Sequence, residues 1–274
     1  MALGCAGAQP EPACAVEVRY LMQAVRAQPR EHVFGQFAYG FALAAADPRV
    51  VGLNLVQAEE DPVSLASYRD QMIAIGYLTK TEPAIKVALH AGELTPAFAS
   101  AADRAFHVRD AVMVAGASRI GHGVDVLGED GADALVHEMA QRGVLVEACL
   151  TSNQQLLDVD GDAHPIKTLV RRGVPVALAT DDQGILRASM TGELVRAVAK
   201  QGLNYHQLKR LVRASLAHAF VPGTRLRDLS ACRAALLAEK LDASCTAALA
   251  GSERATLEWA LEASLDAFET ALVD

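Results

Sequence analysis

The stretch VALHAGE at residues 87–93 joins a short apolar run to a polar cluster, and this arrangement recurs along the chain. Runs of the same kind occupy residues 18–24, 50–57, 85–90, 119–121, 144–149 and 174–179. They are rich in Val, Ile and Leu at successive positions, which is the pattern of parallel strands covered by helices. Each run with the helical stretch after it takes about 30 residues, the size of a βαβ unit. The sequence therefore predicts a parallel α/β sheet.

Helical periodicity fills the intervals between these runs, at residues 31–46, 63–79, 103–116, 130–142 and 163–172. Beyond residue 182 the chain is expected to be almost wholly helical, at 192–200, 205–219, 227–240 and 252–272. No Gly-rich phosphate loop follows any run, which weakens the Rossmann and P-loop alternatives.

The third to sixth runs each end in a polar cluster, and barrel enzymes build their sites at the carboxyl ends of their strands. This placement favours a TIM-type (β/α) barrel, with an open doubly wound sheet as the alternative. Six runs occur where a closed barrel of this type needs about eight strands. The barrel is therefore predicted to be incomplete, without its first two strands and with a helical C-terminal segment.

Composition limits the classes of protein to consider. The chain has 274 residues, of which 51% are hydrophobic, enough to bury a substantial core. Its net charge of −8 argues against binding to nucleic acid, and no apolar run is long enough to cross a membrane. Residues 1–15 lack the features of a secretory signal, so we expect an unstructured leader at 1–16 followed by one partial barrel domain at 17–274. The chain as written is expected to be cytoplasmic, or extracellular or periplasmic if the true N-terminus lies upstream.

The chain has five cysteines, and these are Cys5, Cys14, Cys149, Cys232 and Cys245. Their number is odd, their spacing is wide and no CxxC pair occurs. We therefore expect neither a disulfide framework nor a thiolate zinc site.

Two histidines end neighbouring runs. His90 is followed three residues later by Glu93, a spacing that suits a metal ligand beside a general acid or base. A core histidine with a helix-initiating glutamate is an equal alternative for this pair. His122 lies between Gly121 and Gly123, which allow the backbone to turn sharply and approach a ligand. A turn with a solvent-facing histidine is the alternative here.

Asp181 and Asp182 follow the last run, and adjacent carboxylates at a strand end need a cation or a proton between them. The alternative is a pair that caps a helix. Residues 151–153 (Thr-Ser-Asn) provide hydroxyl and amide groups for a pocket wall, or else a turn. The six remaining histidines show no ligand spacing and are interpreted as surface or structural residues. They are His32, His107, His137, His164, His206 and His218.

The clusters HAGE at 90–93, RIGHG at 119–123, TSN at 151–153 and TDD at 180–182 together resemble the adenosine deaminase family. The sequence around these clusters, over residues 17–225, is most similar to the growth-factor-like branch of that family. The resemblance implies a metal-dependent hydrolase barrel with one Zn²⁺ per chain. Family members take two zinc ligands from a His-X-His on their first strand, and this motif is absent from the 274 residues. An N-terminally truncated deaminase is therefore predicted.

The resemblance also implies roles for single residues. His90 and Asp181 are implied as zinc ligands, Glu93 as the proton shuttle and His122 as the residue that orients or deprotonates the attacking water. Asp182 is implied to bind the imidazole nitrogen of the purine, and the backbone of Gly92 to meet the base.

Three functions follow as hypotheses. The first is zinc-dependent deamination of adenosine or a related purine nucleoside to inosine and ammonia. The second is an inactive remnant that binds purines or a partner, and the third is an amidohydrolase with another ring-amine substrate. An exposed sheet edge predicts a homo-oligomer, with neither nucleic acid nor membrane as a partner.

Overall fold

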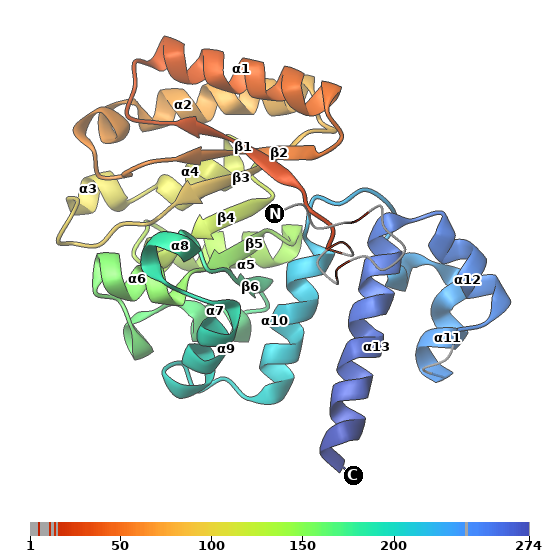
Figure 1. Cartoon of the computed structure of the whole chain (residues 1–274). Helices are drawn as coiled ribbons and strands as arrows, with labels where there is room; N and C mark the ends of the chain where they lie inside the picture. Colours follow the sequence, from red (N-terminus) through yellow and green to blue (C-terminus); the bar gives the residue numbers. More distant parts are fainter. Residues whose placement is uncertain (1–4, 6–10, 12–13, 15, 239–240, 274) are drawn as a thin grey trace.

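The computed structural model describes residues 5, 11, 14, 16–238 and 241–273 (Figure 1). All six predicted strands are present, as β1 (Tyr20–Val25), β2 (Val50–Val56), β3 (Lys86–Ala91), β4 (Arg119–His122), β5 (Leu145–Ala148) and β6 (Val176–Leu178). They pair in sequence order and every pair is parallel. In the described part of the chain no further strand pairs with β1 or β6, so the sheet is an arc that does not close. The predicted leader at 1–16 lies largely outside the described residues.

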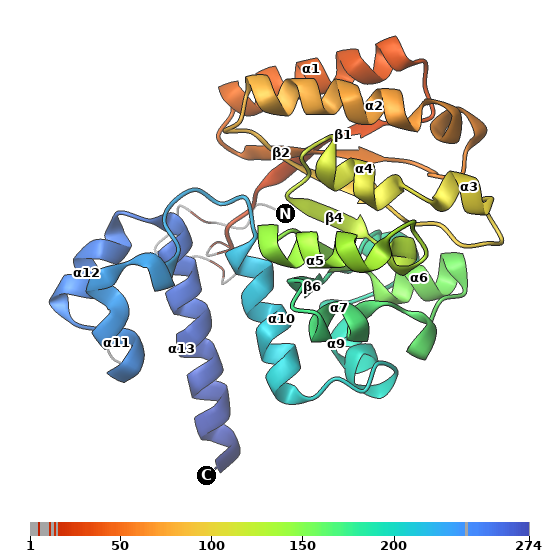
Figure 2. The ribbon, with the colours of Figure 1, turned by 180° about the vertical axis from the view of Figure 1, so that it is seen from behind.

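Four helices cover one face of this sheet, as Figure 2 shows. They are α1 (Arg30–Ala46), α2 (Pro62–Thr81), α4 (His107–Met113) and α5 (Ala132–Arg142). The sequential strand order and the helices on one face are those of a barrel wall, not of a doubly wound sheet. The remaining helices are α3 (Ala101–Arg104), α6 (Leu150–Leu157), α7 (Ile166–Arg171), α8 (Gln183–Leu186), α9 (Met190–Ala199), α10 (Tyr205–Ala217), α11 (Arg233–Ala238), α12 (Ala243–Ala250) and α13 (Glu253–Val273). Short 3₁₀ turns occur at Val124–Leu127, Gly161–Ala163, Leu226–Asp228 and Ser230–Cys232.

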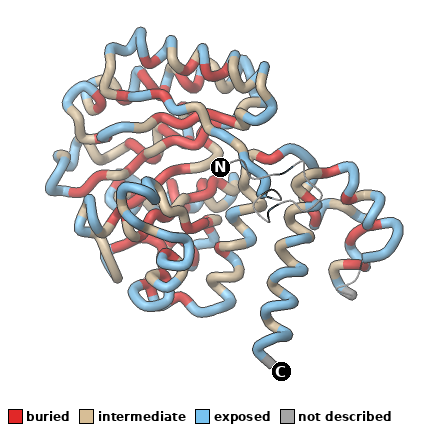
Figure 3. The backbone as a smooth tube through the Cα atoms, viewed as in Figure 1, coloured by how far each residue is buried: buried red, intermediate tan, exposed pale blue. Residues whose placement is uncertain are grey.

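The core lies between the sheet and these covering helices (Figure 3). Leu53, Leu89 and Val146 are fully buried on this outer face of the sheet. Because side chains alternate along a strand, their neighbours Asn54 and His90 face the inner side of the arc. The alternation therefore places apolar core side chains on the outer face of the sheet and polar side chains on the inner face.

Two predicted helices are broken in the structure. The expected helix at 103–116 divides into α3 and α4, because Phe106 leaves the helical conformation with φ −152° and ψ 0°. A residue far along the sequence caps the start of α4, since the Glu129 carboxylate accepts hydrogen bonds from the backbone N–H groups of Val108 and Arg109. The expected helix at 163–172 is shortened to α7 with a 3₁₀ turn before it. Tertiary hydrogen bonds override the continuous helical periodicity here.

The C-terminal helices form a second, small core, and it contains a disulfide that contradicts the sequence-based expectation. Leu226, Leu249 and Ala255 pack around the Cys232–Cys245 disulfide. A second disulfide joins Cys5 and Cys14. The odd count misled the prediction because Cys149 is the single free cysteine of the described residues, and the pairing of the other four depends on folding. None of the described helices is both long and apolar enough to span a bilayer.

Candidate active site

The polar clusters converge at the carboxyl ends of the strands. His90 lies near the end of β3 and His122 ends β4, while Cys149 and Asp181 follow β5 and β6. Candidate ligand atoms of His90, Glu93 and His122 lie within 4.8 Å of one another, and so do those of His122, Cys149 and Asp181. His122 belongs to both groups, whereas the two predicted metal ligands, His90 and Asp181, fall in different groups. Imidazole nitrogen, carboxylate oxygen and thiolate sulfur are the donors that zinc takes in proteins.

His90 presents a free nitrogen to this cluster. Its Nδ1 lies 3.0 Å from the side-chain oxygen of Asn54, which can only accept, so Nδ1 carries the proton and Nε2 keeps its lone pair. Burial lowers the pKa of His90 to about 3, and the charges of His122 and Arg26 act in the same direction. The ring is therefore neutral near pH 7. A neutral histidine whose other N–H donates to a carbonyl is the usual arrangement of a metal ligand.

Glu93 is a protonated acid in this environment. Burial raises the pKa of Glu93 to about 8, and the negative charges of Glu59 and Asp181 add to the effect. One carboxylate oxygen, Oε2, lies 3.5 Å from Nε2 of His122. Burial also lowers the pKa of His122 to about 4, against the charge of Glu59. The pair thus combines an acid that holds its proton at neutral pH with a neutral imidazole.

Glu59, which sequence reasoning missed, anchors the turn that carries Glu93. The backbone N–H groups of Gly92 and Glu93 donate to its two oxygens at 3.0 and 2.8 Å. Nδ1 of His107 lies 2.5 Å from Oε1, and the guanidinium of Arg26 lies 3.8 Å from it. Arg26, Glu59 and His107 are each no more than 1% exposed. The only sequence signal for this network is an acidic residue shortly after a strand that ends at the same edge.

The backbone conformation and close packing at position 92 require a glycine. Its φ is +71°, and an added Cβ would lie 2.7 Å from the side chain of Val108. Its N–H donates to Glu59, and its carbonyl accepts from the backbone N–H of Asp125 at 3.0 Å. The backbone of Gly92 therefore retains only the second lone pair of the carbonyl for a substrate donor.

Left-handed backbone conformations concentrate at this edge. Gln57, His122 and Asp181 have φ values of 85°, 65° and 52° at the ends of β2, β4 and β6. Such conformations cost on the order of 1–3 kcal/mol each and gather at functional sites. His122 and Asp181, at two of these positions, both contribute ligand atoms to the cluster.

The remaining predicted residues lie around this cluster. Asp182 is exposed and begins α8 without a side-chain cap. Residues 151–153 lie in the first turn of α6, and the amide of Asn153 contacts His122 at 2.9 Å. Among the other histidines, His107 and His164 are buried. His32, His137 and His206 are exposed, and His218 is half-buried.

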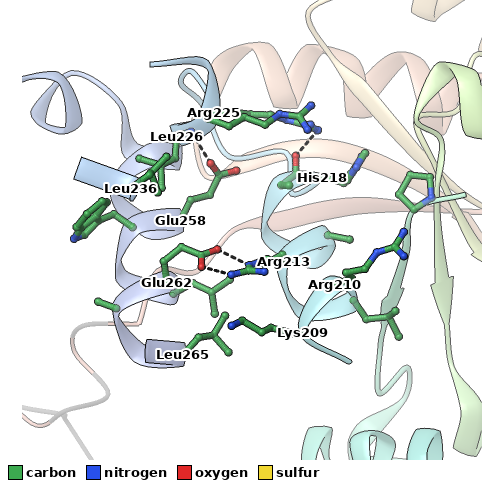
Figure 4. A pocket seen from close by; sticks show the side chains of 18 of the residues that line it. Lys209, Arg210, Arg213, His218, Arg225, Leu226, Leu236, Glu258, Glu262 and Leu265 are labelled. Carbon is green, nitrogen blue, oxygen red and sulfur yellow. Dashed lines mark hydrogen bonds and ion pairs between the residues drawn. The ribbon is translucent and has the colours of Figure 1, made fainter. Parts of the chain in front are cut away.

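Two cavities include residues of β6 in their walls. The smaller one, of about 260 Å³, is lined by Asp181, Arg119 and Glu147 among other residues. A larger cavity of about 920 Å³ lies between α10 and α13, and Figure 4 shows its charged wall of Arg213, Glu262 and their neighbours. None of the predicted site residues lines this larger cavity, so its size does not make it the reaction site.

Comparisons with known proteins bear on the family and the fold of this chain. A sequence model of the family described as Adenosine deaminase matches residues 2–232. An adenine deaminase of Sinorhizobium fredii is 34% identical over 218 residues, which cover 79% of this chain and 61% of the relative. An adenosine deaminase of Aliivibrio fischeri is 36% identical over 153 residues, covering 54% of this chain and 43% of the relative. Among solved structures, an amidohydrolase of Burkholderia ambifaria with bound Zn superposes with a TM-score of 0.57 at 19% identity, over 82% of this chain and 57% of that one.

The chain thus spans about three fifths of the length of the curated relatives that it matches over most of its own length. The growth-factor-like branch is not singled out by these matches and stays a prediction. The family match extends over more than half of the chain and includes every residue of the cluster described above. This chain belongs to the adenosine deaminase family.

Proposed function

We propose that this chain catalyses the hydrolytic deamination of a 6-aminopurine, in which water replaces the amino group and ammonia leaves. The observation that carries the proposal is the meeting of His90, Glu93 and His122 at one strand edge. A neutral ligand-competent imidazole, a protonated carboxylic acid and a second imidazole are the groups that such a reaction needs. Adenosine is the predicted substrate, and the names of the two relatives add adenine as a second purine to test.

The kinds of donor at this edge support a zinc ion. His90 offers a free Nε2, and Asp181 offers a carboxylate within 4.8 Å of the ligand atoms of its own group. When bound there, the metal would supply Lewis acidity that brings water toward ionisation near neutral pH. We propose His90 and Asp181 as its ligands.

The chain's own side chains would move the protons. Glu93 would donate its proton to the ring nitrogen beside the amino-bearing carbon as the water oxygen bonds to that carbon, and the resulting carboxylate would accept the proton that the water loses. The second proton of the added oxygen would then pass to the amino group, which leaves as ammonia while the carbonyl forms. His122 would orient the attacking water through a hydrogen bond from its ring. The exposed Asp182 would form a hydrogen bond with the imidazole nitrogen of the purine, and the Gly92 carbonyl would meet the base.

The first experiment measures zinc and activity on the same purified full-length chain. Zinc is determined by elemental analysis after exhaustive dialysis, and conversion of adenosine, deoxyadenosine and adenine is followed by ultraviolet absorbance. The proposal predicts about one zinc per chain and turnover of at least one purine. Retained zinc with turnover of another ring amine only would point to a different amidohydrolase. Absence of both zinc and turnover would point to a non-catalytic remnant.

A Glu93→Gln variant separates acid catalysis from folding and metal binding. Glutamine keeps the size of the side chain but cannot transfer a proton, so we expect kcat to fall by about 10²-fold or more. Zinc content and melting temperature should stay as in the unmodified chain. Glu82→Gln, an exposed position outside the cluster, is the matched control and should retain activity. Equal activity of the Glu93 variant and the unmodified chain would overturn the role given to Glu93.

A further inference from the structure

A chain of hydrogen bonds runs from the backbone into the candidate site through three buried side chains. Asn153 is fully buried, and His122 and His164 are 1% and 3% exposed. The amide of Asn153 lies between the two rings, 2.9 Å from Nδ1 of His122 and 3.1 Å from Nε2 of His164. Nδ1 of His164 in turn lies 3.2 Å from the backbone N–H of Ile166.

The backbone N–H at one end of this series of hydrogen bonds determines which nitrogen of each ring carries a proton. An N–H of the backbone can only donate, so Nδ1 of His164 must accept and cannot carry a proton. The proton of the neutral His164 ring is then on Nε2, which donates to the oxygen of Asn153. The amide nitrogen of Asn153 faces the other way and donates to Nδ1 of His122. Nδ1 of His122 therefore holds a lone pair.

We infer that Asn153, held in orientation by His164, is a positioning residue that fixes His122 in the tautomer with its proton on Nε2. This proton points into the space that His122 shares with Glu93, whose Oε2 lies 3.5 Å away. His122 thus presents a donor to the cluster, although it belongs to both groups of candidate ligands. The neighbouring ring of His90, with its centroid 4.8 Å away, is set to the opposite tautomer by Asn54.

Because their tautomers are opposite, the two histidines present different groups to the cluster, a lone pair from His90 and an N–H from His122. A metal needs the lone pair that His90 presents, whereas the oxygen of a water that gives up a proton gains negative charge and can accept from the N–H that His122 presents. The tautomer is a property of the folded chain alone. Its part in deamination rests on the proposed function, in which it would make His122 a hydrogen-bond donor to the attacking water.

The test reads the tautomer directly. The metal-free full-length chain is labelled with ¹⁵N-histidine, and long-range ¹H–¹⁵N spectra report which ring nitrogen carries the proton. The chain has eight histidines, and the resonances of His122 are those that disappear in a His122→Gln variant. We expect Nδ1 of His122 in the unprotonated region of the spectrum and Nε2 in the protonated region. The reverse assignment in the unmodified chain would overturn the inference by itself.

An Asn153→Asp variant tests the cause. A carboxylate of the same shape only accepts, so it requires a proton on Nδ1 of His122, and the two nitrogens should exchange their spectral regions. Asn204→Asp is the matched control, because Asn204 caps α10 with its oxygen and aspartate keeps that bond. An unchanged His122 tautomer in a folded Asn153→Asp chain would contradict the positioning role.

Activity separates this inference from the proposed function. In an active chain, Asn153→Asp should lower kcat by about 10²-fold or more, because His122 no longer donates to the attacking water. If the unmodified chain shows the expected tautomer but no turnover, the proposed function fails and the positioning role stands. If it turns over a purine with the reverse tautomer, the positioning role fails and the function stands.

Discussion

Removing the charge of Glu59 should cost the fold about as much as any single change in this chain. Burial works to raise the pKa of Glu59, but the hydrogen bond from His107 and the charge of Arg26 outweigh it and lower that pKa from 4.5 to about 2. At about 1.4 kcal/mol for each pKa unit, this corresponds to about 3 kcal/mol of stability at pH 7. The figure agrees with the roughly 3–5 kcal/mol lost when one partner of a buried ion pair is removed. Glu59→Gln is therefore expected to lower the free energy of unfolding by about 3 kcal/mol.

The pH dependence provides the sharper test. Because the pKa of Glu59 is depressed in the folded chain, its contribution is fully present above the unfolded value of 4.5 and is lost as the pH falls toward 2. The difference between Glu59→Gln and the unmodified chain should shrink from about 3 kcal/mol at pH 7 to less than half of that at pH 3. Urea unfolding followed by circular dichroism measures both values, with Glu60→Gln as the control. A loss below about 1 kcal/mol at pH 7, or an equal loss at both pH values, would refute the reasoning.

Two further changes test the packing. Gly76→Ala should destabilise the chain by about 1–3 kcal/mol, because its Cβ would lie 2.2 Å from the carbonyl oxygen of Val114. Gly35→Ala should instead stabilise the chain by up to about 1 kcal/mol, because Gly35 lies in a helix and nothing lies within 4 Å of the added Cβ. Urea unfolding measures both variants, and a change of the same sign in the two would contradict this reasoning. Reduction of the Cys232–Cys245 disulfide, which closes a loop of 13 residues, should cost about 3 kcal/mol. Calorimetry should then show the transition of α11–α13 at a lower temperature, and an unchanged melting curve would count against a stabilising disulfide.

The strands and the edge where the site forms are predictable from the sequence. All six strands occur within two residues of their predicted ends, because buried parallel strands must be continuously apolar. Once the strands are placed, the topology brings their carboxyl ends together. Residues that directly follow a strand, such as His90 and Asp181, can therefore be assigned to one edge without a structure.

The supporting layer is not predictable in the same way. Glu59 meets the turn at Gly92 and the ring of His107 across 33 and 48 residues of sequence. Asn153 appears in the sequence as part of a turn or pocket wall, and His164 as one of six unremarkable histidines. Their roles arise from which donor faces which acceptor, and that depends on side-chain orientation after folding. Cysteine pairing was mispredicted for the same reason.

Residues of the chain itself cover part of the inner face of the open sheet. Phe220, just after α10, lies so close to β2 that a Cβ on Gly52 would approach its ring at 2.8 Å. The same ring lies 4.7 Å from the guanidinium of Arg119, which pairs with Glu147 at 2.5 Å on the inner face. Phe220 and the Arg119–Glu147 ion pair thus cover part of the inner face between β2 and β5. The strained backbone and the unusual pKa values occur at the carboxyl ends of the strands, and the cavity that Asp181 lines reaches this ion pair, so the cover and the candidate site adjoin on the inner face.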